Sequence, residues 1–326
     1  MSVVRETARW LGRLVLSLYL STLLVFAAIE ISIDGGMAAV VLGAEQGVVD
    51  LDDEAYAAVR PGTQALVETF HLRDPIPVRH ARWFADAARG DLGRSIRDQP
   101  VDTLMTPRLP ISAQIAFAGL AIALVLGVAA GLIGALLTRP GPRLTHAVVT
   151  ATLQATPAFL LATFGVWFFA VRLGWLPAAG WERLSAGLGP NLRNLLLPLA
   201  AVALPEAGMI ARIVMTSTQQ VLDEEYVIAA TAKGLPRRQV FLRHVMRPAS
   251  MTLLTQVGLI FGSMLGGVVI VERLFGIGGL GSVLFEGSIN RDTHVVAAIT
   301  AYITAVIVAV RALSDATYRW ADPRLR

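Results

Sequence analysis

The stretch EEYVIAATAKGLPRRQVFLRHVMRP, residues 224–248, decides how this chain is interpreted. It is polar, basic and helix-prone, yet it lies between two apolar runs that are each long enough to cross a membrane. A turn between two spans needs only a few residues. The stretch therefore predicts a structured element on one side of the membrane.

The same stretch predicts two short helices joined by a tight corner. Three acids, Asp223 to Glu225, open it, where a helix dipole favours negative charge, and an Ala-rich helix runs from Tyr226 to Ala232. Gly234 suits the left-handed position that ends a helix, and Pro236 suits the first turn of the next helix. Apolar residues then recur at helical spacing from Arg237 to Arg247, which predicts one apolar and one basic face; they are Val240, Phe241, Leu242, Val245 and Met246.

Apolar runs predict six membrane-spanning helices, and thus an all-α integral membrane protein. Each run must be helical, because backbone amides in hydrocarbon have no other partner within a single segment. The expected spans are Leu14–Ile33, Ile111–Leu137, Ala147–Val171, Leu195–Ile213, Met251–Val271 and Val295–Leu313. The chain is 55% hydrophobic and only 16% charged, whereas soluble domains carry about 25% charged residues.

Basic residues predict the orientation. With the N-terminus in the cytoplasm, the inner segments are richer in arginine and lysine than the two short outer loops, as the positive-inside rule requires. Both termini and the 212–250 segment are then cytoplasmic. The long 34–110 segment is then an extracytoplasmic loop, for which we expect short helices over Asp53–Phe70 and Val78–Ala88 and turns at RPG and RGDLG.

Residue content restricts the chemistry of the chain. It has no cysteine, which excludes disulfides and thiolate sites, and its five histidines show no metal-ligand spacing. Lys233 is the only lysine, and the Gly-Leu after it does not fit the Gly-Lys-Ser/Thr of a phosphate-binding loop. The GIGGLG of residues 276–281 follows a membrane span rather than a strand, which favours a tight turn on the outer side over a dinucleotide site. We expect no catalytic, cofactor or metal site.

Three interpretations of residues 224–248 remain open on physical grounds. The two helices could lie on the bilayer with their arginines on anionic lipid, could form a solvated loop, or could dock a partner protein. The Gly-Leu-Pro corner favours docking, because a surface helix has no need to turn back.

At these residues the chain resembles a family, the permease subunits of binding-protein-dependent ABC importers, in the oligopeptide/dipeptide/nickel branch. The branch pattern is close to Tyr-Val-Arg-Thr-Ala-Arg-Ala-Lys-Gly-Leu, and residues 226–235 read YVIAATAKGL. Further similar motifs occur in the family's order; they are RGDLGRSI (89–96), TPAFLLATFGVWFF (156–169), LGWLPAAGW (173–181), VERLFGIGGLG (271–281), NRDTHVV (290–296) and DPRLR (322–326). Thr231 and Gly278 depart from the family, which usually has arginine and proline there.

The resemblance implies one transmembrane permease domain over 1–326 with the type I importer fold, in a bacterial inner membrane. It implies a second homologous permease, two cytoplasmic ATPase subunits that bind ATP and magnesium, and an extracytoplasmic solute-binding protein as partners. The 212–250 segment becomes the cytoplasmic coupling loop that sits in a groove of the ATPase. The implied coupling residues are Tyr226, Ala229, Ala230, Lys233, Gly234, Leu235, Pro236, Arg237, Arg238, Phe241 and His244.

The chain is then expected to be a translocation subunit rather than an enzyme, moving peptides inward by alternating access. Nickel or metal-chelate complexes and oligosaccharides are alternative substrates, and an ion-driven transporter or a membrane enzyme using the 34–110 loop are rival classes. Glu206 in the fourth span is the ionisable residue most suited to face a path, although pairing with a neighbouring helix is equally compatible. Glu30, Glu272 and Arg311 lie near span ends, where structural roles are expected.

Small residues in the fifth span complete the expected path. Gly262, Ser263 and Gly266 stand at spacings that allow close approach of helices, so they line a path, contact a second subunit or pack within this chain. Arg291 and Asp292 are expected to form a local ion pair in an outer turn.

Overall fold

The structure is a computed structural model that describes residues 2–31, 64, 67–183 and 187–321. Over these residues the chain is helical, with one isolated bridge between Arg94 and Pro100 and no named strand. It divides into two compact units, each described by itself: Met1–Pro110 with Gly278–Val306, and Ile111–Ile277 with Ile307–Arg326. The predicted all-α class is confirmed.

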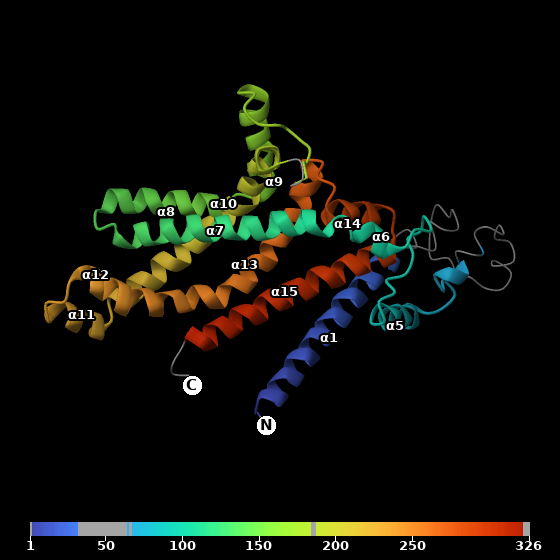
Figure 1. The fold of residues 1–326 in the computed structure, drawn as a ribbon, viewed down its shortest axis with the longest axis horizontal. Helices are drawn as coiled ribbons and strands as arrows, with labels where there is room; N and C mark the ends of the chain where they lie inside the picture. Colours follow the sequence, from blue (N-terminus) through green and yellow to red (C-terminus); the bar gives the residue numbers. More distant parts are fainter. Residues whose placement is uncertain (1, 32–63, 65–66, 184–186, 322–326) are drawn as a thin grey trace. The chain divides into compact units, whose positions relative to one another are not determined.

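Five helices of the described chain are long and apolar enough to cross a membrane (Figure 1). They are α1 (Ser2–Glu30), α7 (Leu109–Leu136), α10 (Leu188–Leu222), α13 (Met246–Leu274) and α15 (Thr293–Ala321). They match the first, second, fourth, fifth and sixth predicted spans. The long apolar α13 also continues, without a break, the shorter helices α12 and η3 that precede it.

The predicted third span, Ala147–Val171, is not one straight helix. α8 (Pro140–Ala155) and α9 (Ala158–Gly165), which continues into the π-helical η1 (Val166–Arg172), are bent by 98° at the break. Pro157 explains the break, because its ring disfavours helical backbone at the preceding residue, and Thr156 is extended with φ −86° and ψ 117°. Six spans are counted only if this bent pair crosses once.

Glycines bring α7, α8 and α10 into close contact in the second unit. A Cβ at Gly208 would lie 2.6 Å from the carbonyl oxygen of Thr150, and one at Gly131 would lie 2.6 Å from that of Ala211. The helices thus pack almost backbone to backbone, as small residues allow in membranes. Beside these contacts lies an apolar core built on Ala123, Ala203, Ile210, Val214 and Ile260.

In the first unit, α5 (Ile76–Ala87), α6 (Val101–Met105) and α14 (Leu280–Ile289) pack with α1 and the start of α15 around one core. The helix predicted over Val78–Ala88 is confirmed as α5. The helix predicted over Asp53–Phe70 and the RPG turn at residues 60–62 lie largely outside the described residues. α14 was missed, because only a turn was expected after the fifth span.

A buried ion pair ties α5 to α1. The guanidinium of Arg79 lies 3.0 Å from the carboxylate of Glu30, and both side chains are about 95% buried, at 5% and 6% exposure. Arg79 also donates to the carbonyl of Phe70, and the hydroxyl of Thr293 donates to Glu30. The expected structural role of Glu30 is confirmed by these contacts.

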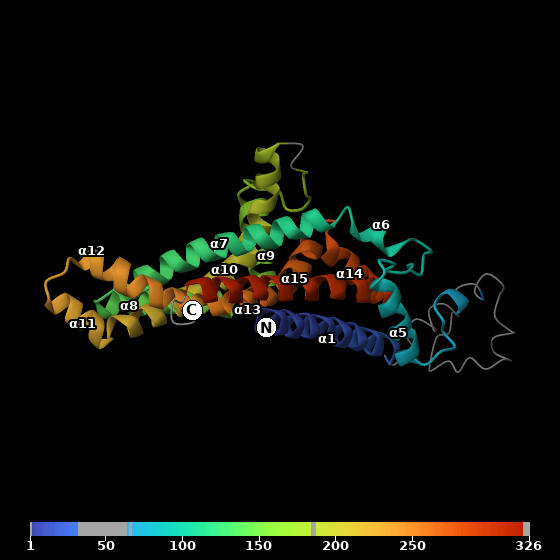
Figure 2. The same cartoon turned by 60° about the horizontal axis from the view of Figure 1, so that its bottom comes forward.

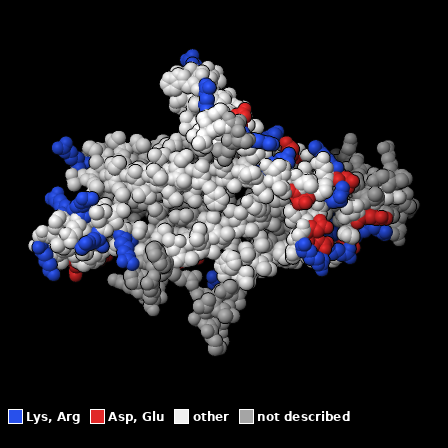
Figure 3. Space-filling model, in the orientation of Figure 1, with Lys and Arg blue, Asp and Glu red and all other residues white. Residues whose placement is uncertain are grey.

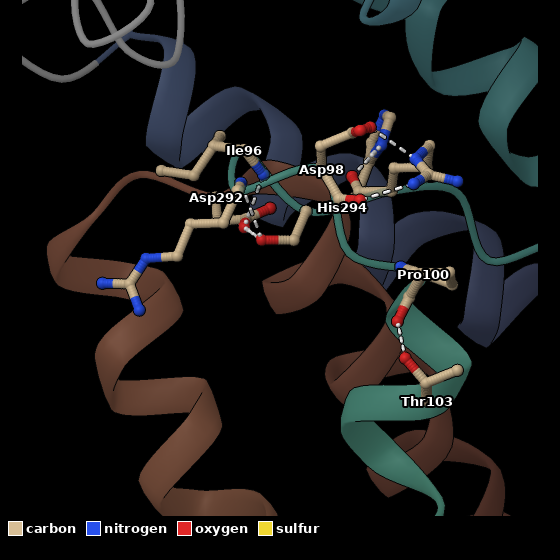
Figure 4. A network of polar contacts seen from close by, with 9 residues as sticks. Ile96, Asp98, Pro100, Thr103, Asp292 and His294 are labelled. Carbon is tan, nitrogen blue, oxygen red and sulfur yellow. Dashed lines mark hydrogen bonds and ion pairs between the residues drawn. The ribbon is translucent and has the colours of Figure 1, made fainter.

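The segment that follows the RGDLG turn, residues 94–96, and the corner between α14 and α15 meet in a polar network (Figure 4). The Asp292 carboxylate accepts hydrogen bonds from the Ser95 hydroxyl at 2.6 Å and the Ile96 amide at 3.0 Å. Burial raises the pKa of Asp292, and these donors act against that rise. The sequence analysis predicted a local ion pair between Asp292 and Arg291. It missed Ser95 and Ile96, which are almost 200 residues away from Asp292 in the sequence.

Glycines shape both predicted outer turns. Gly90 and Gly93 in RGDLG have positive φ, and a Cβ at Gly93 would lie 2.8 Å from Nδ1 of His294. In GIGGLG, Gly276 has φ +63° and turns the chain from α13 towards α14. The tight turn expected there is confirmed.

Candidate coupling hairpin and polar groove

Most of the segment predicted as the coupling loop, residues 212–250, is helical. Residues 212–222 form the last three turns of α10, and residues 237–250 belong to a helix that runs on into α13. Only residues 223–236 lie between these long helices, and they contain α11 (Glu225–Ala232). Helical backbone thus continues from both neighbouring spans into polar sequence, and the assignment of 212–250 as the cytoplasmic coupling loop stays a prediction.

The corner after α11 is a Schellman motif. The Gly234 amide donates to the carbonyl of Thr231 at 3.0 Å, and the Leu235 amide donates to that of Ala230 at 3.4 Å. Gly234 has φ +79°, the left-handed conformation that glycine adopts most readily. The sequence therefore placed the end of the helix correctly.

The second arm of the hairpin comprises α12 (Arg237–Val240) and the π-helical η3 (Phe241–Val245). Pro236 is the residue before this helix rather than within its first turn, with ψ 135°. Val240 and Val245 are buried against Val227 and Ala230 of α11, which confirms an apolar face. Leu242, assigned to that face, is 53% exposed, because the wider π turn rotates it outwards.

The hairpin, labelled α11 and α12 in Figures 1 and 2, exposes most of the predicted coupling residues. Those exposed are Tyr226, Ala229, Lys233, Gly234, Pro236, Arg237 and Arg238, while Leu235, Phe241 and His244 are half-buried. Ala230 is buried and holds the two arms together. The Tyr226 hydroxyl donates to the carbonyl of His244 at 3.3 Å, which links the start of α11 to the second arm.

The acidic and the basic residues of the hairpin line two different hollows. An acidic hollow of about 810 Å³ at its start is lined by Asp223, Glu224, Glu225 and Tyr226. A second, mainly apolar hollow of about 740 Å³ carries Arg237 and Arg238. Lysine and arginine gather over this end of the second unit (Figure 3). The hairpin therefore exposes both acidic and basic side chains near its corner, where a partner protein could form ion pairs with them.

Sequence reasoning missed the residues that complete the apolar hollow. Leu136 at the end of α7, Leu222 at the end of α10 and the exposed Ile228 line it together with Phe241. The exposed apolar side of α11 is visible in the sequence, but its proximity to α7 depends on the packing of distant segments.

The predicted path residues divide between two surfaces. The Ser263 hydroxyl on α13 donates to the Glu206 carboxylate on α10 at 3.0 Å, and a Cβ at Gly266 would meet open space. Gly262 instead lies beside Ile307 of α15, 3.7 Å from where its Cβ would be. The structure thus brings Glu206 and Ser263 together, while Gly262 packs within this chain.

The other ionisable residues near span ends have structural contacts. Glu272 is fully buried and accepts a hydrogen bond from the Ser112 hydroxyl at 2.6 Å. The backbone of Arg311 packs against Gly258, whose Cβ would lie 2.9 Å from the Arg311 Cα atom. Within the described residues, no group of three His, Asp or Glu side chains could hold a metal ion.

Comparison with known proteins now adds to this geometry. Residues 123–326, well over half of the chain, match the family described as binding-protein-dependent transport system inner membrane component. The chain belongs to this family. It is a multi-pass inner-membrane permease subunit of an ABC importer and works with an ATPase and a binding protein.

Relatives cover most of the chain. It is 33% identical over 269 residues to the oligopeptide transport system permease protein OppB of Escherichia coli (strain K12), covering 82% of this chain and 86% of OppB. The probable peptide ABC transporter permease protein y4tP of Sinorhizobium fredii is 30% identical over 282 residues, covering 84% and 90%. These relatives are transport permeases, which agrees with a translocation subunit that is not itself an enzyme.

Solved structures share the fold. An inward-facing structure of the MetNI methionine ABC transporter aligns with a TM-score of 0.56 at 17% identity, covering 67% of this chain and 96% of that chain. A second crystal form of the same transporter gives a TM-score of 0.54 at 18% identity with the same coverage. The predicted importer permease fold is confirmed.

Proposed function

We propose that this permease moves peptides into the cytoplasm. The observation that carries the proposal is the likeness over more than four-fifths of the chain to permeases named for oligopeptide or peptide transport. In this proposal a second permease, two ATPase subunits and a solute-binding protein complete the importer. ATP and magnesium bind to the ATPase subunits, and this chain holds no cofactor.

The hairpin of residues 223–248 is proposed as the element that the ATPase holds. Its corner is fixed by backbone hydrogen bonds, and its second arm continues without a break into α13. A displacement of the corner is therefore transmitted along a continuous helix rather than absorbed by a flexible loop. This continuity supports rigid-body coupling between ATP binding and the swing of the spans.

The substrate is tested by uptake into vesicles containing the whole importer. Labelled di- to pentapeptides are supplied with the solute-binding protein of the importer, with nickel chelates and oligosaccharides as competitors. We expect ATP-dependent accumulation of peptide that neither competitor reduces. Accumulation of a chelate or a sugar, with no accumulation of peptide, would refute the assignment.

A further inference from the structure

A polar seam runs between α10 and α13. Glu206 meets Ser263 at 3.0 Å, and nearer the cytoplasmic hairpin a hollow of about 340 Å³ is lined by Thr216 of α10 and Thr252 of α13. Thr216 follows Glu206 by ten residues on α10, and Thr252 precedes Ser263 by eleven residues on α13. Two antiparallel helices that stay side by side are expected to show such nearly equal separations. The contact and the hollow therefore lie along the same α10–α13 interface, and the hollow together with its extension along this interface to Glu206, about 15 Å in all, is called the α10–α13 groove.

This groove contains a carboxylate and a guanidinium that pair with no charged group. Arg212 lines the hollow, together with the side chains of Gln154, Thr216 and Gln220. Among the described residues neither Glu206 nor Arg212 takes part in an ion pair. Ionisable groups on a membrane-spanning helix are costly and commonly serve transport.

The spacing of the two charges fits a short peptide. Glu206 and Arg212 are six residues apart on α10, so the helix rises about 9 Å and turns by about 120° between them, which leaves their Cα atoms about 10 Å apart and their side chains on neighbouring sides of the helix. An extended chain advances at most about 3.3–3.6 Å per residue, so a tripeptide spans about 10 Å between its ends. Its ammonium group and its carboxylate are opposite in sign to the two side chains, and a guanidinium binds carboxylate through two parallel hydrogen bonds.

We infer that the α10–α13 groove binds the two charged termini of a transported peptide, with the ammonium group at Glu206 and the carboxylate at Arg212. The inference rests on the proposed function and deepens it by naming free termini as the recognised chemistry. Thr216, Gln220 and Gln154 supply neutral hydrogen-bonding groups near Arg212, so the groove accepts peptides irrespective of their side chains. Ser263 orients the Glu206 carboxylate by donating to it.

Because this chain contains no cysteine, a single introduced cysteine is its only reactive thiol, and its modification is read on this chain after the subunits have been separated. Thr216→Cys and Ser263→Cys are made in the whole importer, and inside-out vesicles without nucleotide are treated with an anionic ethylsulfonate or a cationic ethyltrimethylammonium methanethiosulfonate. Thr218→Cys is the matched control, because Thr218 is on the same helix and its side chain is fully buried. Trialanine and its C-terminal amide are the peptide probes.

We expect the anionic reagent to modify Thr216→Cys about three- to tenfold faster than the cationic reagent does. At Ser263→Cys we expect the cationic reagent to react faster by a similar factor. Differences of this size are expected from one charge about 6 Å from the thiol in a partly hydrated site. Arg212→Gln should abolish the first preference and Glu206→Gln the second. Trialanine should slow the modification of Thr216→Cys, and its amide should slow it less. Thr218→Cys should remain unmodified.

Four results would overturn the inference: Thr216→Cys as unreactive as Thr218→Cys, no charge preference, a preference that survives Arg212→Gln, or equal protection by trialanine and its amide. Each leaves the proposed function standing if wild-type vesicles still accumulate peptide. Loss of peptide accumulation in wild type would instead refute the proposed function and the inference together.

Discussion

Gly234 determines the corner of the hairpin through its backbone rather than its surroundings. Its φ is +79°, and a Cβ at this position would meet no atom within 4 Å. A side chain there would thus cause backbone strain without a clash. For a β-branched residue the left-handed conformation costs about 1–2 kcal/mol, enough to shift the corner to another conformation.

Gly234→Val should therefore uncouple transport. We expect uptake and binding-protein-stimulated ATP hydrolysis to fall at least about fivefold, the effect of roughly 1 kcal/mol, while assembly with the ATPase persists. Both rates are measured in proteoliposomes. Gly141→Val is the control, because Gly141 also has open space but no positive φ, and Gly234→Asn should be milder. Normal uptake by Gly234→Val would show that the corner does not transmit the motion.

His80 provides a pH-dependent contribution to the stability of the first unit. It is fully buried among the rings of Tyr19, Phe26 and Phe84, and its Nε2 lies 2.9 Å from the Thr22 hydroxyl. Burial lowers the pKa of His80 from 6.5. The unfolded chain consequently binds more protons than the folded chain just below pH 6.5, so this stability is present above that pH and lost as pH falls.

Between about pH 7.5 and about pH 5, His80→Gln should lose less stability than the wild-type protein. The difference in the free energy of unfolding should be up to about 1.4 kcal/mol for each unit by which folding lowers the pKa of His80. Unfolding is followed by tryptophan fluorescence of the purified complex. His71→Asn is the control, because asparagine tolerates the positive φ of 51° at that position. An unchanged pH dependence in His80→Gln would assign the acid sensitivity to other groups.

At the scale of elements, a small apolar core holds together α11 and the second arm of the hairpin that we propose as the docking element. Val227, Ala230, Val240 and Val245 are its buried members. The core leaves Arg237 and Arg238 exposed at an apolar hollow, while the acids line a separate hollow. Reversing the two arginine charges should change the surface without disturbing the core.

Arg237→Glu with Arg238→Glu should lower the amount of ATPase that copurifies with the permease by at least about tenfold, as expected when two charge contacts become repulsive. Arg139→Glu with Arg143→Glu, at the start of α8, is the matched control and should leave copurification nearly normal. The ratio of ATPase to permease on a stained gel is the measurement. Full copurification by the hairpin variant would exclude these arginines from the interface.

At the scale of the whole molecule, the distribution of basic residues predicts that the hairpin lies in the cytoplasm and α14 outside. Ala229→Cys on α11 and Ser288→Cys on α14 are both exposed positions. In cells that express this chain without its ATPase, an impermeant maleimide should label Ser288→Cys in intact cells and Ala229→Cys only in inside-out vesicles. The reverse pattern would invert the topology.

The division into two units sets different tasks for different parts of the chain. The first unit joins α1, α5 and the α14–α15 corner through the buried Arg79–Glu30 pair and the hydrogen bonds of Asp292. The second unit carries the coupling hairpin and the polar groove. That residues 1–326 act as a single permease domain stays a prediction. It requires the two units to function together.

The sequence by itself determined the helical class, five of the spans, the Schellman corner and the family, because these depend on local hydrophobicity, on glycine and proline conformation and on contiguous motifs. Tertiary structure alone decided which distant residues come together: Ser95 with Asp292, Glu206 with Ser263, and Arg212 and Thr252 around one hollow. It also decided how far α10 runs past Ile213. Side-chain pairing across helices depends on their relative rotation and register, and no short window of sequence contains that information.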